Sequence, residues 1–193
     1  LDSDVEGVLS RSSVEEVYKS ILDDLDSAED YLNTSAWELG YNYRFNTLSP
    51  DAMRSRVYLY MGKWSESLEA SKRVLAERPQ LSSVSSELPN AYNSVENIVA
   101  LEQTMQSQYA RTIKVDRNFF AKYSSTDLRR RAYFRQVTTS NITVIKGGSN
   151  TYSCTFRSGE MYLNAAEAAW HLGQYDDARQ YTADIYAARY SDG

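Results

Sequence analysis

Apolar residues recur at steps of three and four along several stretches of the chain, which is the pattern of a helix with one buried face. The first stretch follows Ser12 and Ser13, and each serine has a glutamate three positions later. This is the capping-box pattern that opens helices. The apolar stripe behind it consists of Val14, Tyr18, Ile21, Leu25, Ala28 and Leu32. We therefore predict a first helix that begins near Ser13 and buries one face.

Two later segments, residues 58–75 and 169–185, share one arrangement. Each has a helical stretch, a glycine, an aromatic residue two positions on and a small residue three positions after that. The matching residues are Gly62, Trp64 and Ser67 in the first segment and Gly173, Tyr175 and Ala178 in the second. Glycine ends a helix readily because it adopts the left-handed conformation. The arrangement is that of a tetratricopeptide-like helical hairpin, and such hairpins bury their apolar faces only by packing against each other.

A different composition separates the two hairpins. Residues 137–145 are rich in Thr, Val and Ile, and residues 152–156 resume this strand-like character after the Gly147-Gly148 pair. We predict that these two segments form a small β-hairpin. Residues 95–101 fit either a short strand or one helical turn. The predicted fold is mainly α, made of tetratricopeptide-like helical hairpins with a small β-hairpin element.

Charge is distributed unevenly along the chain. The net charge of −5 argues against general nucleic-acid binding. Residues 1–33 nevertheless hold ten acidic and two basic residues, whereas residues 111–135 hold eight basic and two acidic ones. The favoured interpretation is that the basic stretch lies against the acidic first helix and neutralises it. The alternative is that the basic stretch forms an anion-binding patch.

The inventory of reactive side chains favours a protein without catalysis. One histidine, His171, and one cysteine, Cys154, are too few for zinc sites of the His/Cys kind and for Ser-His or Cys-His catalysis. Paired carboxylates such as Asp176 and Asp177 are adjacent on a helix, so they point in different directions rather than at one substrate. We predict neither an enzyme nor a cofactor or metal site.

Aromatic residues in the loop between the first two helices follow no helical stripe. Trp37, Tyr41 and Tyr43 lie here beside Asn42 and Arg44. Flat rings stack on the apolar faces of pyranoses, and amide or guanidinium groups donate hydrogen bonds to sugar hydroxyls. The three rings are therefore the candidate ligand-binding residues. The alternative is that they close over the ends of the helices.

Several segments, in their order along the chain, resemble one protein family. They are residues 13–28, residues 44–60 with the following Gly-Lys-Trp, the Val-Glu-Asn-Ile of residues 95–98, the Asp-Leu-Arg of residues 127–129, and residues 156–168 with their Ala-Glu-Ala. Together they are similar to the SusD/RagB-like outer-membrane nutrient-binding proteins of Bacteroidetes. The final segment, residues 185–190, is similar as well, although Tyr186 stands where the family has asparagine.

The resemblance implies a fold, a location and partners. It implies that residues 1–193 form a single SusD-like helical domain, a fragment without the family's usual N- and C-terminal parts. The full-length precursor would be a lipoprotein with a signal peptide, anchored by lipid at the surface of the outer membrane. It would bind an oligosaccharide or other nutrient and deliver it to a SusC-type TonB-dependent β-barrel transporter. The alternative function is a helical-repeat adaptor that binds a peptide or protein partner.

Overall fold

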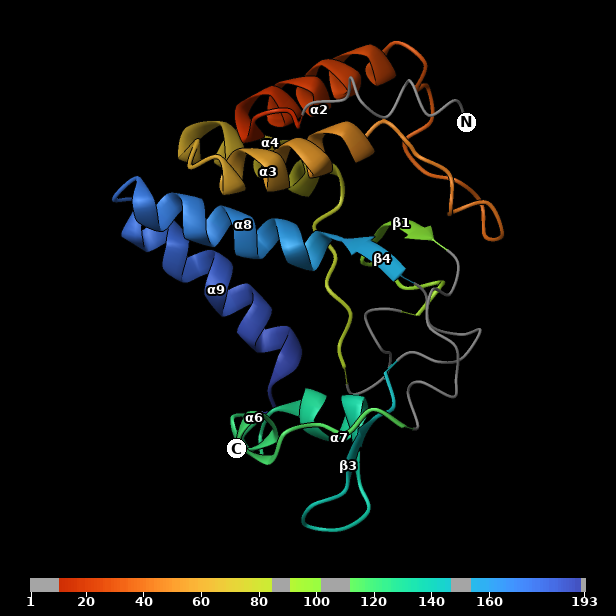
Figure 1. Ribbon diagram of the computed structural model, residues 1–193, viewed down its shortest axis with the longest axis vertical. Coiled ribbons are helices and arrows are strands. Elements are labelled where there is room, and N and C mark those ends of the chain that lie inside the picture. Colours follow the sequence, from red (N-terminus) through yellow and green to blue (C-terminus); the bar gives the residue numbers. More distant parts are fainter. Residues whose placement is uncertain (1–10, 85–90, 102–111, 147–153, 192–193) are drawn as a thin grey trace.

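The computed structural model describes residues 11–84, 91–101, 112–146 and 154–191 (Figure 1). Its helices are α2 (Val14–Glu29), α3 (Ser49–Tyr60), α4 (Trp64–Glu77), α6 (Arg117–Ala121), α7 (Leu128–Tyr133), α8 (Ser158–His171) and α9 (Tyr175–Arg189). Its strands are β1 (Asn97–Leu101), β2 (Phe134–Gln136), β3 (Ile142–Val144) and β4 (Cys154–Arg157). The chain is therefore mainly helical, as the sequence predicts.

Both predicted helical hairpins form. Helices α3 and α4 make the first, α8 and α9 make the second, and α8 packs against α4 (Figure 1). Gly62 and Gly173 have φ angles of 70° and 75°, in the left-handed region that favours glycine. The two glycines thus produce the turns that the sequence pattern indicated.

Small side chains line the seam between the hairpins. Leu68 of α4 is buried against a group of alanines, namely Ala165, Ala168, Ala169 and Ala178. Alanine leaves room for helices to approach closely and costs little conformational entropy. At one end of the seam, the rings of Trp64 and His171 stack 3.9 Å apart with an interplanar angle of 7°. The prediction that the hairpins lie side by side is confirmed.

A buried polar network crosses the same seam. The hydroxyls of Ser55 in α3 and Ser71 in α4 are 2.7 Å apart, and the Asn164 amide of α8 donates to Ser55 Oγ at 2.9 Å. Ser67 Oγ donates to the Ser55 carbonyl, and Ser71 Oγ donates to the Ser67 carbonyl. Because a buried polar group without a partner is costly, these bonds fix the three helices in one register.

Helix α2 is the outermost helix of the bundle and lies against α3 (Figure 1). The capping box is confirmed: Ser13 Oγ accepts from the Glu16 backbone N–H at 3.1 Å, and Glu16 accepts from the Ser13 N–H at 2.7 Å. The predicted burial of one face is only partly correct. No residue of α2 is buried, and its apolar stripe is half-exposed; among the described elements, α3 is the main one that packs against it.

The strands form two separate pairs. β2 and β3 make a small antiparallel hairpin in which Phe134 lies opposite Val144. β4 pairs instead with β1, with Val99 opposite Phe156. The predicted hairpin between residues 137–145 and 152–156 is therefore wrong, and residues 97–101 resolve as a strand. The reason lies in the core: Ile98 and Val99 of β1 are buried against Val74 and Met161, so β1 offers β4 a buried partner strand.

An ion pair inside the core ties the end of α9 to the residue before β1. Arg189 Nη2 donates to Glu96 Oε1 at 2.6 Å, and the two side chains are only 7% and 0% exposed. Ser82 donates to the same oxygen through its backbone N–H at 2.9 Å and its hydroxyl at 3.0 Å. Glu96 Oε2 has no hydrogen-bond partner among the described residues and lies over Gly159, where an added Cβ would come within 2.8 Å of it.

Candidate functional site

The aromatic loop between α2 and α3, residues 33–48, is attached to β1 and the turn before it. The Ala100 N–H of β1 donates to the Asn42 carbonyl at 2.9 Å, and the Asn46 amide donates to the Ile98 carbonyl at 2.7 Å. The Asn42 amide donates to the Tyr92 carbonyl at 2.5 Å. These bonds to strand and turn backbone hold the loop in a fixed position beside the small sheet.

Arg44 gathers the three candidate rings into one cluster. Its guanidinium carbon lies 5.2 Å from the ring centroid of Trp37, 4.9 Å from that of Tyr41 and 5.8 Å from that of Tyr43. These distances are within the range of cation–π contacts. Trp37 Nε1 also donates to the Phe45 carbonyl at 2.9 Å. The residues named from the sequence thus come together in space, around an arginine whose central place the sequence did not indicate.

Much of this cluster remains open to solvent. The Tyr41 and Tyr43 side chains are 43% and 41% exposed, and Leu39 and Phe45 of the same loop are exposed as well. Neighbouring exposed apolar side chains are a common feature of surfaces that bind ligands or other proteins. The rings offer flat apolar faces, and Arg44 adds N–H donors beside them. Ligand binding by Trp37, Tyr41 and Tyr43 remains a prediction.

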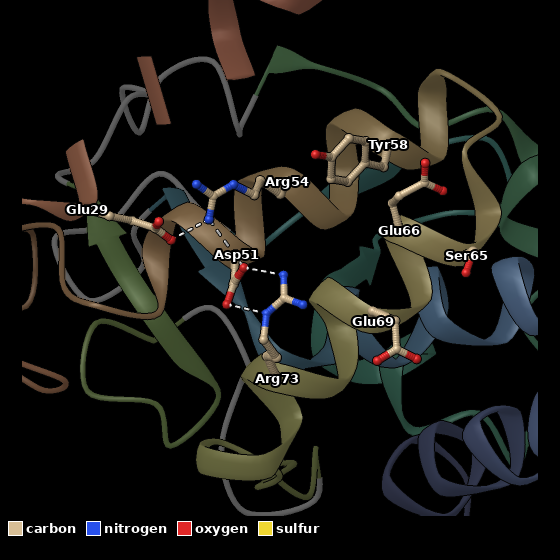
Figure 2. A pocket seen from close by; sticks show the side chains of 8 residues that line it. All are labelled: Glu29, Asp51, Arg54, Tyr58, Ser65, Glu66, Glu69 and Arg73. Carbon is tan, nitrogen blue, oxygen red and sulfur yellow. Dashed lines mark hydrogen bonds and ion pairs between the residues drawn. The ribbon is translucent and has the colours of Figure 1, made fainter. Parts of the chain in front are cut away.

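Apart from the aromatic cluster, a polar pocket of about 650 Å³ opens between α2, α3 and α4. Figure 2 shows the residues that line it: Glu29, Asp51, Arg54, Tyr58, Ser65, Glu66, Glu69 and Arg73. Arg54 pairs with Glu29, with Asp26 at 2.6 Å and with Asp51 at 3.4 Å, and Arg73 forms two bonds to Asp51 at 2.8 Å and 2.7 Å. This arrangement joins the three helices through one network of charges.

The charges of this network satisfy one another. The Glu29 carboxylate, followed by that of Asp26, raises the pKa of Arg54 well above its ordinary value, although burial acts in the opposite direction. Asp51 likewise raises the pKa of Arg73. Paired side chains have few donors left for a ligand, and Tyr58 is the single ring on the pocket wall. The pocket therefore suits attachment of α2 to the bundle better than it suits sugar stacking.

An apolar groove of about 830 Å³ runs between α8 and α9 on the side away from α4. Leu163 and Trp170 of α8 and Tyr186 of α9 line it together with small residues, and all three are exposed. The sequence gives no sign of this groove, because Trp170 and Tyr186 lie within helical stretches, where composition does not show which side chains stay exposed. The groove is a second exposed apolar surface.

Among the residues that the structure describes, the predicted contact between the basic stretch and the acidic first helix does not occur. Asp26 and Glu29 of α2 pair with Arg54 of α3. Helices α6 and α7, which carry the basic stretch, lie at the opposite end of the molecule from α2 (Figure 1). The favoured interpretation is therefore wrong, and Arg54 of the neighbouring helix pairs with two of the α2 carboxylates instead. The anion-binding patch remains a prediction.

Within the basic region, Asp127 and Arg129 form a local anchor. Asp127 caps α7, accepts two bonds from the Arg129 side chain at 2.9 Å and 2.7 Å, and pairs through its backbone with Tyr190 after α9. Burial alone would raise the pKa of Asp127, but hydrogen bonds from Arg129 outweigh burial and hold that pKa below its ordinary value. Glu160 and Arg56 similarly join α8 to α3 at 2.6 Å and 2.7 Å. Both pairs hold together segments that are distant in the sequence.

Lys146, beside this region, is expected to make the free energy of unfolding depend on pH. Burial, followed by repulsion from Arg157, Arg189 and Arg129, lowers the pKa of Lys146 to about 8. The unfolded chain keeps an ordinary lysine pKa near 10.4, so between these values the unfolded state holds more protons and stability rises with pH. We expect the free energy of unfolding to rise by roughly 1–2 kcal/mol between pH 7.5 and 9.5. Urea unfolding at the two pH values measures this.

The variant Lys146→Met is the control for that measurement. It keeps the apolar length of the side chain and removes the titrating group, so it should flatten the pH dependence and raise stability at pH 7.5. An equal rise in the wild-type chain and in Lys146→Met would contradict the assignment to Lys146.

Two general properties of the described residues bear on function. No helix in this part of the chain has both the length and the apolar character needed to cross a membrane. No group of three or more His, Cys, Asp or Glu side chains within it is arranged to hold a metal ion.

Comparison with known proteins decides the family. A family model described as the SusD family matches residues 91–189, just over half of the chain. The chain belongs to the SusD family. The matched segment runs from the turn before β1 to the end of α9, so it includes the Glu96–Arg189 ion pair, the Asp127–Arg129 anchor and the second helical hairpin. The family resemblance noted from the sequence is confirmed. No curated protein matches the chain.

Solved structures of SusD-like proteins share the fold. A SusD superfamily protein from Bacteroides thetaiotaomicron aligns with a TM-score of 0.75 at 24% identity, covering 94% of this chain and 49% of its own. A SusD-like carbohydrate binding protein from Bacteroides vulgatus gives 0.75 at 22%, with 94% and 44% covered. Surface glycan-binding protein A from Bacteroides uniformis gives 0.71 at 15%, with 93% and 51% covered. The chain spans about half the length of these relatives.

Proposed function

We propose that this chain is the carbohydrate-binding part of a non-catalytic nutrient-capture protein at the bacterial cell surface. The observation that carries the proposal is the cluster of Trp37, Tyr41 and Tyr43 around Arg44. Partly exposed rings with hydrogen-bond donors beside them suit the alternating apolar and hydroxyl surfaces of a sugar. The carbohydrate-binding and glycan-binding descriptions of two relatives support the same ligand class.

The proposal extends to the whole protein of which this chain would be a segment. In it, the helical hairpins form a rigid support, and the aromatic loop captures the sugar. The captured oligosaccharide passes to a SusC-type TonB-dependent β-barrel transporter in the outer membrane. A lipid anchor on the full-length precursor would hold the protein at the cell surface. Family membership supports this location and this partner.

A helical-repeat adaptor is the second candidate function, and the apolar groove between α8 and α9 favours it. Leu163, Trp170 and Tyr186 offer exposed apolar surface in a groove, which is the kind of site that accepts a helical peptide. The aromatic loop and the groove involve different tryptophans. One pair of variants therefore separates the two candidate functions.

Trp37→Ala is expected to weaken glycan binding about tenfold or more, because it removes the largest ring of the cluster. Trp170→Ala, the matched control in the groove, should leave glycan affinity unchanged. A glycan array identifies a ligand and isothermal titration calorimetry measures the dissociation constants. Tyr41→Ala should weaken binding as well, and it avoids the hydrogen bond through which Trp37 holds the loop.

Two outcomes would overturn the proposed site. Unchanged affinity in both Trp37→Ala and Tyr41→Ala would remove the loop from the binding surface. Absence of binding to every glycan on the array, together with peptide binding that Trp170→Ala abolishes, would replace the glycan-binding function with the adaptor function.

A further inference from the structure

We propose that the aromatic loop selects acidic glycans, with Arg44 binding the carboxylate of a uronic acid residue while the rings stack on the sugars. This inference rests on the proposed function and adds the class of ligand. The guanidinium of Arg44 has no acidic partner in the described part of the chain. Among the described residues, no carboxylate pairs with this guanidinium and no group accepts a hydrogen bond from it, although three rings contact it.

Five other arginines of the chain differ from Arg44 in having an acidic partner. Arg54, Arg73, Arg129, Arg179 and Arg189 each form an ion pair with an aspartate or glutamate. The positive charge of each of these arginines is therefore paired with a carboxylate of the protein itself. Arg44 is the one basic residue of the aromatic loop, and Glu38, the one acidic residue there, forms no ion pair with it. The positive charge of Arg44 is therefore available to a ligand.

The contact with the rings positions Arg44 without consuming its donors. A cation–π contact acts between the charge and the electron-rich face of a ring, so the N–H groups of the guanidinium remain free to donate. Three rings from the same loop also restrict the side chain, which lowers the entropy lost when a ligand is bound. A planar guanidinium with free N–H groups matches a carboxylate with two parallel hydrogen bonds.

The neighbouring surface suits the remainder of such a ligand. Tyr41 and Tyr43 are close to Arg44 and about two-fifths exposed, so a pyranose can stack on a ring while its carboxylate lies at the guanidinium. A neutral sugar could use the rings but would leave the charge of Arg44 without a counter-ion. The cluster therefore distinguishes an acidic sugar from a neutral one of the same shape.

The test uses pairs of ligands that differ only in the carboxylate. The 193-residue chain is titrated by calorimetry with a panel of uronate-containing oligosaccharides and with their carboxyl-reduced forms. We expect at least one acidic member to bind about tenfold or more tightly than its reduced form. The preference should shrink as sodium chloride is raised from about 50 mM to about 500 mM, because the pair is solvent-accessible.

Variants then assign the preference to Arg44. Arg44→Gln keeps a polar side chain but removes the charge, so it should bring the acidic and reduced forms to within about twofold of each other while binding of the reduced form persists. Arg44→Lys keeps the charge but loses the planar pair of donors, so it should retain part of the preference. Lys63→Gln is the matched control, because it removes another cation that contacts a ring, at Tyr58.

The outcomes separate this inference from the proposed function. If the reduced forms bind as tightly as the acidic ones and Trp37→Ala weakens both, the loop binds glycans and the selection of acids is wrong. If the preference exists but survives Arg44→Gln, another residue recognises the carboxylate and the inference is overturned. If neither form of any glycan binds, the proposed function fails as well.

Discussion

Arg189→Met is expected to lower the free energy of unfolding by about 3–5 kcal/mol, because it leaves the Glu96 carboxylate buried without its counter-ion. Glu96 is fully buried, and Arg189 supplies the one cation that bonds to it among the described residues. Water cannot replace the lost partner without opening the core at the point where α9, β1 and the start of α8 meet. Urea denaturation followed by circular dichroism measures the loss.

Two further variants test whether the loss of stability comes from the buried ion pair. Arg179→Met is the matched control on the same helix, because its ion pair with Asp176 is exposed, and we expect a change of about 0.5 kcal/mol or less. The double variant Glu96→Gln with Arg189→Met removes both charges and should recover part of the stability. A loss for Arg189→Met as small as that for Arg179→Met would show that the buried pair contributes little.

The parts of the fold that local sequence dictates were predictable. Gly62 and Gly173 mark the two turns, and the spacing of apolar residues marks the helices on either side. The pairing of β1 with β4 was not predictable, because more than fifty residues separate these strands and strand composition gives no register. The same holds for Glu96 and Arg189, whose contact depends on how α9 returns past β1. The family resemblance did include both segments, although it did not indicate that they touch.

In the candidate site as well, some features follow from local sequence and others depend on the fold. The sequence identifies Trp37, Tyr41 and Tyr43 because their spacing fits no helix. It does not show that Arg44 lies among all three rings, since that depends on how the loop turns between α2 and α3. The predicted contact between the basic stretch and the acidic first helix was wrong for a similar reason. A count of charges along the chain suggests which stretches attract each other, but it does not show which residues lie close together in the fold. Arg54 lies on the helix adjacent to α2, and it pairs with two of the α2 carboxylates.

The second large effect is expected at the seam between the hairpins, where Leu68→Ala should lower the free energy of unfolding by about 3–5 kcal/mol. Leu68 is 2% exposed, and its buried neighbours across the seam are alanines. The cost of a large-to-small substitution depends on how far the surroundings can collapse into the cavity. Alanine has no rotatable heavy atoms beyond Cβ, so the alanines cannot fill the space, which leaves only the partly buried Leu59, Trp64 and Tyr181 to relax towards it.

Leu163→Ala on α8 is the control, because Leu163 is 53% exposed and faces away from the seam, and we expect a loss of about 0.5–1 kcal/mol. Amide hydrogen exchange adds a second measurement. If the seam couples the hairpins, Leu68→Ala should speed exchange in α8 and α9 as well as in α4, which carries the substitution. Faster exchange in α4 alone would mean that each hairpin is stable without the other, and the seam would then not be the source of the chain's cooperativity.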